Sequence, residues 1–482
     1  MKKLSIAVVI LVVVLLLVTP WGVGGFAEKR MDTGLEQLVE AAPYLTVVER
    51  KYTKGWFKSE HVVTFEAFGG WMKALSPKAV EDDAADDAGT VEVPEEPAKP
   101  EEPLRFTVRN EVLHGPVLGL TGFGLARVNS HLVFDDKVRK ELEEVFGPKA
   151  PLEVTTRLGF FGGGRTTFKS EGRTIKPKDS QTEITWETFK LAVGYSGNLD
   201  EYDVDGTWPK LEMSDKSART QFVMTNMTMD GDGKRVRGDL YDGDFDLSVE
   251  KVTFFDDNQN EVEVSQAQYL VTSESKGEFT GMSAKLGTGE IKSKVLSAQG
   301  VEIKEAHYDL SVRRLHTETL EKVITAFKAT YAKPLATTVE GDEVMFAPLK
   351  AHGMELLKYD PEFVIDRIGV ATPEGDGYVM GVVKLKGATA EDFGVGSMAL
   401  IGKIDADITF NVSEKMIQKF PNGSTAAGAA VDSGYAKREG ERLICKIVFK
   451  NGELTVNGKP QAIPGLGGPP PGVESMEPPP QE

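Results

Sequence analysis

Cysteine is nearly absent from this 482-residue chain, which contains only Cys445. A single cysteine cannot form an intrachain disulfide, and it cannot build a thiolate cage for zinc or for an iron–sulfur cluster. An excess of basic residues is also missing, and the formal net charge is −18. Nucleic-acid binding needs clustered lysine and arginine to displace counterions from the phosphates. These absences argue against a disulfide scaffold, a thiolate metal centre and a nucleic-acid-binding protein.

Charge is absent from Leu4 to Phe26, a run that follows Lys2 and Lys3. As a helix, these residues would extend about 34 Å, enough to cross a hydrocarbon core of about 30 Å. The two lysines predict a cytoplasmic amino terminus and export of everything after Phe26. Cleavage of a signal peptide is the alternative, because the most apolar part ends at Val18 and Gly25-Phe26-Ala27 resembles a cleavage site.

Beyond residue 43 the hydrophobic pattern changes from a helical period to the alternation typical of strands. Leu443, Cys445 and Ile447 alternate with polar residues, and Asn451-Gly452 and Asn457-Gly458 follow. Both central residues of a type I′ turn need positive φ, so these pairs predict hairpins. We interpret four Asp-Gly pairs as further turns, at 205–206, 230–231, 242–243 and 376–377.

The sequence therefore predicts a mainly β (α+β) fold: a single N-terminal transmembrane helix, then a large, elongated and curved antiparallel β body with a few packed helices. Helices are expected at 28–42, at Thr317–Tyr331, at 346–359 and just after Ser413. The expected domain order is an anchor at 1–27, a membrane-proximal helix and first strands at 28–80, an acidic Pro-rich disordered insert at 81–103, a mainly β periplasmic body at 104–463 and a disordered Pro/Gly-rich tail at 464–482.

The acidic insert accounts for half of the net charge. Between Glu81 and Glu102 the chain has ten acidic residues against Lys99 alone, a net of −9. Such a segment repels itself and has little apolar surface to bury, so it predicts disorder. The rest of the exported chain is only mildly acidic.

None of the chemical motifs in the sequence is complete. Glu111 and His114 have the spacing of a helical metal pair, but a strand-like run and Gly115-Pro116 predict a turn histidine bonded to the backbone. The glycines at 162–164 lack the Lys-Ser/Thr of a phosphate loop and predict a hairpin turn. The aspartates at 242, 244 and 246 begin like a calcium loop that then lacks its glycine and its glutamate.

We therefore expect no catalytic residues, no cofactor and no metal site. Cys445 is interpreted as a buried strand residue. Tyr52, Trp56, Phe57 and Phe65 form an aromatic group soon after the predicted anchor. We interpret this group as sheet core; the alternative is an interface or a lipid-facing entry to a hydrophobic groove.

Several short motifs occur in order along the exported chain, and together they resemble the YdgA family, a bacterial envelope family of unknown biochemical function. They are the basic-then-apolar amino terminus and the segments 52–59, 110–116, 157–161, 356–361 and 451–458. The resemblance implies an inner-membrane anchor and a periplasmic body, and it supplies no catalytic residue. We interpret the motif residues as structural: Gly55, His114, Gly115, Pro116, Asn451, Gly452, Asn457 and Gly458.

Two functions suit these expectations. The first is a non-enzymatic envelope scaffold or accessory factor, with the membrane and envelope proteins or lipids as partners. The alternative is a module that binds lipid or acyl chains in a hydrophobic groove in the periplasm. A groove requires contiguous apolar side chains without a protein layer over them, whereas a scaffold buries that face.

Overall fold

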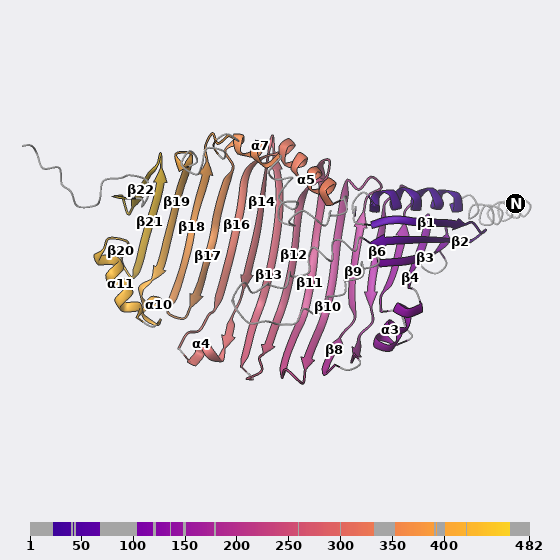
Figure 1. Cartoon of the computed structure of the whole chain (residues 1–482), viewed down its shortest axis with the longest axis horizontal. Coiled ribbons are helices and arrows are strands. Elements are labelled where there is room, and N and C mark those ends of the chain that lie inside the picture. Colours follow the sequence, from indigo (N-terminus) through magenta and orange to yellow (C-terminus); the bar gives the residue numbers. More distant parts are fainter. Residues whose placement is uncertain are drawn as a thin grey trace, which may run out of the picture. The chain divides into compact units, whose positions relative to one another are not determined.

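The computed structural model describes residues 23–39, 42, 45–67, 104–118, 122–134, 136–147, 151–177, 180–258, 260–298, 300–331, 352–389, 392, 401–420 and 422–462. Most of them lie in antiparallel strands (Figure 1), which confirms the mainly β prediction. The chain divides into two compact units. Unit 1 comprises residues 1–167, 196–198 and 324–351, and unit 2 comprises 168–195, 199–323 and 352–482.

Three predicted features fall wholly or largely outside the described residues. These are the anchor before residue 23, the acidic insert at 81–103 and the tail at 464–482. Among the helices that can be described, none has both the length and the apolar character needed to cross a membrane. The predicted anchor therefore stays a prediction.

Unit 1 contains an antiparallel sheet built from consecutive strands, β1 (Leu45–Thr53), β2 (Lys58–Ala67), β3 (Leu104–His114), β4 (Ala126–Val133) and β5 (Glu153–Leu158). β6 (Gly164–Ser170) follows β5 after a tight turn, in which the Gly159 N–H donates to the Gly163 carbonyl at 2.7 Å. The glycine run thus forms the predicted turn. The helix α3 (Asp136–Phe146), between β4 and β5, was not predicted.

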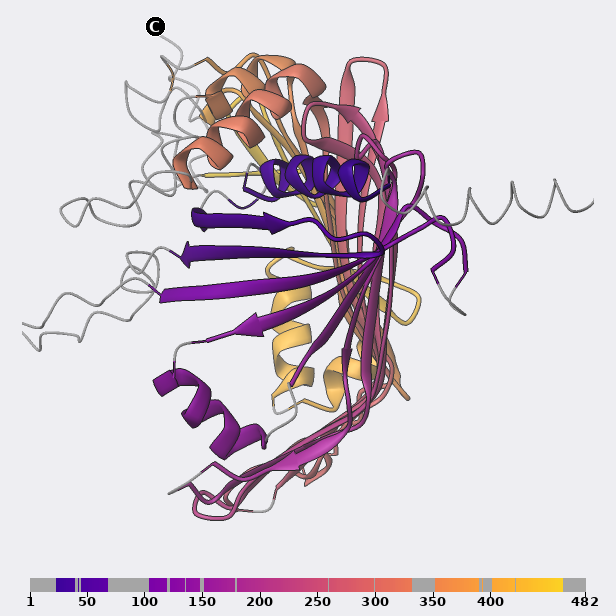
Figure 2. The same ribbon diagram turned by 90° about the vertical axis from the view of Figure 1, so that its right-hand side faces the viewer.

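A helix that includes the described residues 23–39 lies beside β1, β2 and β3 (Figure 2), and it already contains residues before the predicted first residue, 28. Ala27 on this helix is fully buried against Val112, Ala126 and Val128 of the sheet, and Met31 packs at the edge of the same cluster. Residues four apart lie on one face of a helix, so Ala27 and Met31 point to the sheet together. This apolar contact docks the helix on unit 1.

Unit 2 is built on long antiparallel strands that pair mostly in chain order. β8 (Thr182–Trp186) and β9 (Phe189–Tyr195) both pair with β10, and β7 (Arg173–Ile175) pairs with β8. The ladder then runs through β10 (Glu201–Asp215), β11 (Thr220–Arg237), β12 (Leu240–Phe255), β13 (Glu261–Lys276), β14 (Phe279–Thr288), β16 (Glu305–His316), β17 (Glu362–Thr372), β18 (Gly375–Leu385), β19 (Ile404–Ser413), β21 (Arg442–Lys450), β22 (Glu453–Val456) and β23 (Lys459–Gln461). The short strands β15 (Ile291–Ser293) and β20 (Lys437–Glu439) pair with β13 and β21.

Short helices accompany this sheet. α5 (Thr317–Tyr331) begins at the predicted residue, and α10 (Glu414–Gln418) follows Ser413 as expected. The described part of the segment expected at 346–359 forms two short turns of helix, α7 (Met354–Leu356) and η3 (Leu357–Tyr359). The sequence did not predict α4 (Lys294–Ala298) or α11 (Gly423–Asp432). Figure 2 shows the strands of unit 2 bending, with α10 and α11 on the inner side of the bend.

The Asn-Gly turns are present, and the Asp-Gly turns are not. Asn451, Gly452, Asn457 and Gly458 have φ values of 54°, 80°, 50° and 80°, as a type I′ turn requires. By contrast, the pairs at 205–206, 230–231, 242–243 and 376–377 lie inside strands β10, β11, β12 and β18.

Close approach of neighbouring atoms explains glycine within these strands. A Cβ at Gly243 would come within 2.0 Å of the Asp232 carbonyl oxygen. At Gly233, which shares β11 with the pair at 230–231, a Cβ would lie 2.2 Å from the Tyr202 ring. Glycine in a strand interior often marks such a contact rather than a turn.

Two glycine-to-alanine changes should therefore have opposite effects. Neither Gly452 nor Gly428 has any atom within 4 Å of an added Cβ, but only Gly452 has positive φ. Gly452→Ala should lower the free energy of unfolding by about 1 kcal/mol, because alanine is strained there. Gly428→Ala in α11 should raise it by about 0.5–1 kcal/mol. Urea unfolding of both variants measures the difference, and equal midpoints would contradict the turn assignment.

Candidate functional site

One face of the unit 2 sheet carries apolar side chains in register across neighbouring strands. Tyr308 of β16 pairs with Leu286 of β14 and with Ile368 of β17. Alternate residues of a strand share a face, so residues paired in this way point to the same side. The first row is Leu286, Tyr308, Ile368, Val379, Phe410 and Cys445. The second row, two residues along, is Thr288, Ala306, Val370, Gly377, Val412 and Leu443.

A groove of about 400 Å³ lies over these two rows, lined by residues of β14, β16, β17, β18, β19 and α10. Ala306 and Gly377 leave space in the second row because their side chains are small. Met416 of α10 closes one side, and a Cβ at Gly377 would lie 3.2 Å from its Cε. Leu286, Tyr308 and Phe410 are 46%, 52% and 40% exposed. Among the described residues, this apolar face is therefore only partly covered.

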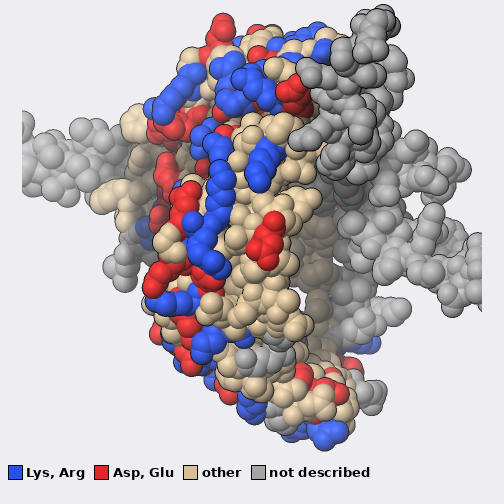
Figure 3. Space-filling view, turned by 90° about the vertical axis from the view of Figure 1, so that its left-hand side faces the viewer, with Lys and Arg blue, Asp and Glu red and all other residues tan. Residues whose placement is uncertain are grey.

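The opposite face of the same strands carries charge. Lys384 and Glu362 are partners in the ladder and form an ion pair at 2.5 Å. Lys446 of β21 forms an ion pair at 3.1 Å with Asp407 of β19, two residues along from its ladder partner Thr409. Figure 3 shows charged side chains gathered along one side and an uncharged surface next to them. The sheet is thus amphipathic, with one charged face and one apolar face.

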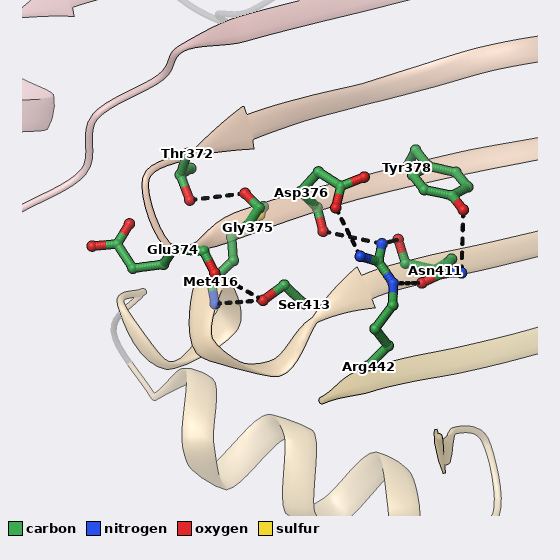
Figure 4. A network of polar contacts seen from close by, with 9 residues as sticks. All are labelled: Thr372, Glu374, Gly375, Asp376, Tyr378, Asn411, Ser413, Met416 and Arg442. Atoms are coloured by element: carbon green, nitrogen blue, oxygen red, sulfur yellow. Dashed lines mark hydrogen bonds and ion pairs between the residues drawn. The ribbon is translucent and has the colours of Figure 1, made fainter. Parts of the chain in front are cut away.

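A polar network on the charged face, at one end of these strands, joins three of them (Figure 4). Arg442 donates from Nη1 to the Asp376 carboxylate at 2.8 Å and from Nε to the Asn411 side-chain oxygen. Its guanidinium lies 5.6 Å from the Tyr378 ring centre, and the Asn411 amide donates to the Tyr378 hydroxyl at 3.2 Å. The bond from Arg442 holds the pKa of Asp376 below its usual value. The network connects β18, β19 and β21.

The same corner fixes the start of α10. The Ser413 hydroxyl donates to the Glu374 carbonyl at 3.0 Å and accepts from the Met416 N–H at 3.4 Å. Gly375 has φ of 135°, and a Cβ there would lie 2.5 Å from the Ser413 side chain. The tight β17–β18 turn therefore anchors the N-cap of α10, which places Met416 beside the groove.

The chain matches a family described as "Bacterial protein of unknown function (DUF945)" over residues 1–464. The protein belongs to the DUF945 family. No curated protein and no solved structure matches it. The family identity agrees with a bacterial protein and assigns no reaction, so the residues of this DUF945 member must be interpreted from their own surroundings.

His114 lies at the end of β3 and is 4% exposed in the DUF945 protein. Its Nε2 is 2.8 Å from the Ser59 hydroxyl, and its Nδ1 is 3.1 Å from the Trp56 carbonyl oxygen. A serine next to a histidine resembles part of a nucleophilic site. However, a Cβ at Gly24 would lie only 2.5 Å from the imidazole, so the helix at 23–39 closes the pair off.

Further motif residues of unit 1 accommodate close backbone contacts. A Cβ at Gly55 would lie 2.1 Å from the Lys58 carbonyl oxygen, and one at Gly115 would lie 1.8 Å from that of Gly124. Pro116, which follows Gly115, accepts from the Gly124 N–H at 3.1 Å. These positions shape the turns after β1 and β3.

His61 is a buried residue that belongs to none of the sequence motifs. It is 2% exposed, and its Nδ1 lies 3.3 Å from the Asn110 amide nitrogen. Burial lowers the pKa of His61, since a charged imidazole would be poorly solvated there. The sequence does show that His61 and Ser59 lie on the same face of β2, because they are two residues apart. Alternation does not show which face is buried when the residues on it are polar.

The four aromatic residues of the predicted group differ in burial. Phe65 is 4% exposed and stacks on Phe106 with ring centres 5.4 Å apart. Tyr52 lies against His61, with ring centres 5.9 Å apart. Trp56 and Phe57 occupy the β1–β2 turn and are 51% and 52% exposed. The structure thus separates two residues of the sheet interior from two of its surface.

The remaining candidate ligands are dispersed. Over the described ranges, no three His, Cys, Asp or Glu residues converge in a way that could hold a metal ion. Asp242 and Asp246 lie along β12, where Asp242 accepts from the Ser275 N–H at 2.9 Å. Cys445 is half-buried rather than fully buried, and burial raises the pKa of its thiol.

Replacing Arg442 tests this polar network. Arg442→Gln should lower the free energy of unfolding at pH 7 by about 1 kcal/mol, because Asp376 loses its charged partner. The folded pKa of Asp376 lies below its unfolded value, so this contribution is full above about pH 5 and declines as the pH falls through 4 toward the folded pKa. The difference in the free energy of unfolding between wild type and Arg442→Gln should therefore be smaller at pH 3 than at pH 7.

Urea unfolding at pH 7 and pH 3 measures this difference. Lys446→Gln is the control, because its pair with Asp407 is half-exposed and should contribute little. A difference for Arg442→Gln that stays constant down to pH 3 would contradict the role assigned to Asp376.

Proposed function

We propose that this DUF945 member is a membrane-tethered envelope protein of the YdgA type that binds an apolar chain, such as the acyl chain of a lipid, in the unit 2 groove. It acts as a binding module and not as an enzyme. The observation that carries the proposal is the pair of apolar rows beneath a partly open groove. A scaffold that uses the same face would need a protein partner over it.

The size and lining of the groove support this choice. Ligand pockets for small molecules are about 300–1,000 Å³ and mostly apolar, with few polar groups; this groove has a volume of about 400 Å³. Its lining includes His307 and Thr288 but no carboxylate, lysine or arginine. Such a lining suits an uncharged chain, and each buried methylene contributes about 0.8 kcal/mol before the costs of binding.

The location is inferred from the sequence. The uncharged run Leu4–Phe26 after two lysines, together with the resemblance to the YdgA family, supports an inner-membrane tether with the bulk of the chain in the periplasm. Reporter fusions at Glu28 and at Glu482 should both report a position outside the cytoplasm. A cytoplasmic carboxyl end would refute this topology.

Ligand binding can be tested with two variants on opposite faces of the sheet. Leu286 lies in the first apolar row, whereas Met380 follows Val379 in β18 and points to the charged face; both are 46% exposed. Leu286→Asp should remove most bound lipid, at least tenfold, because a carboxylate in the groove loses its water. Met380→Asp should retain the bound lipid, because residue 380 points to the charged face. Native mass spectrometry of the full chain in mild detergent measures the adducts.

Three outcomes distinguish the functions. A reproducible lipid adduct lost only in Leu286→Asp supports the groove. Equal adducts in both variants would show that lipid binds elsewhere. A protein partner in fixed stoichiometry, without lipid, would favour the scaffold.

A further inference from the structure

Unit 1 exposes large apolar side chains at one end of its sheet. Three turns lie there, between β1 and β2, β3 and β4, and β5 and β6, together with the start of the helix at 23–39. We name this set of turns and the helix start the turn end of unit 1. Its exposed residues are Phe26, Trp56, Phe57, Phe123, Phe160 and Phe161, at 68%, 51%, 52%, 82%, 49% and 95% exposure.

Backbone hydrogen bonds hold the three turns next to one another. The His114 N–H donates to the Phe57 carbonyl at 2.9 Å, which joins the β1–β2 turn to β3. The Gly115 N–H donates to the Leu125 carbonyl, and the Leu125 N–H to the Leu158 carbonyl, both at 2.8 Å. The turns that carry the exposed aromatics are therefore held side by side at one end of the sheet.

The helix start belongs to the same end. The Tyr52 hydroxyl, at the end of β1, donates to the Gly24 carbonyl at 3.2 Å. The Arg30 guanidinium covers Gly162 in the β5–β6 turn, where a Cβ would lie 2.7 Å from it. Phe26, between these contacts, is the last residue of the uncharged run that begins at Leu4.

The position of Phe26 at this end favours a lipid bilayer over a protein as the partner of the exposed surface. Single exposed apolar residues are normal on soluble proteins, but a contiguous set marks an interaction site. Tryptophan is enriched where a membrane meets water, and phenylalanine is typical of the apolar side of segments that lie in that interface. Basic residues stand within three positions of each turn, namely Lys54, Lys58, Arg127, Arg157 and Arg165. Lys58 pairs with Glu111, an acidic neighbour at this end.

We propose that the turn end of unit 1 rests in the headgroup region of a lipid bilayer, with its aromatic side chains at the interface and its basic residues near anionic lipid phosphates. The bilayer is the one that the run Leu4–Phe26 would enter. Unit 1 is thus oriented by a surface contact and not held by the tether alone. This contact is separate from the unit 2 groove.

Depth-dependent fluorescence quenching tests the proposal. The full chain, with Cys445→Ser, carries one new cysteine labelled with an environment-sensitive dye and is placed in nanodiscs containing one-third anionic lipid. Phe160→Cys probes the turn end. Leu132→Cys is the matched control, because Leu132 is 47% exposed and Phe160 is 49% exposed. Leu132 lies six residues along β4 from Ala126, about 20 Å away.

Brominated lipids should quench the dye at 160 at least threefold more than the dye at 132. Equal quenching at both positions would overturn the proposal. Protection of position 160 from aqueous iodide without quenching by brominated lipid would also overturn it, because it would indicate a second copy or another protein on this surface. Circular dichroism shows whether both variants keep their strand content. Lipid adducts in the unit 2 groove are measured separately, so either proposal can fail alone.

Discussion

The register of the unit 2 strands is the constraint on which its candidate site depends. A shift of one residue in any pair would move apolar side chains to the charged face. β17 contains the irregularity that preserves this arrangement, because its pairing with β18 skips from Ile365 to Ile368. Two residues three apart normally lie on opposite faces of a strand, but the bulge places both isoleucines on the apolar face. The groove is continuous because of this irregularity.

The polar contacts of unit 2 support that register from its ends. The Arg442 network joins β18, β19 and β21, and Ser413 links the neighbouring turn to α10. The other charged pairs on the same face as this network add little energy each, since they are at least partly exposed. Their greater effect is on solubility and on which face of the sheet is exposed, because burying the charged face in place of the apolar face would be costly. The groove is therefore shaped by packing and its position is maintained by polar contacts.

Unit 1 uses its buried polar groups differently. Ser59, His114 and the Trp56 carbonyl satisfy one another beneath the helix at 23–39, where an unpaired polar group would be costly. Helix docking, turn geometry and these hydrogen bonds agree, so the turn end of unit 1 is built rigidly. A rigid surface suits a contact that orients a domain, whereas the partly open face of unit 2 suits a ligand that enters and leaves.

The sequence by itself determined what depends on neighbouring residues. The Asn-Gly hairpins, the start of α5 and the cap of α10 follow from local φ and capping preferences, and all are present. The Asp-Gly pairs misled because the contacts that require glycine, such as the Asp232 carbonyl against Gly243, come from another strand. Only the tertiary structure decided the groove, since Tyr308 meets Ile368 through pairing across some sixty residues of chain. Local preferences carry no information about which distant strands pair, and pairing is what places side chains on a shared face.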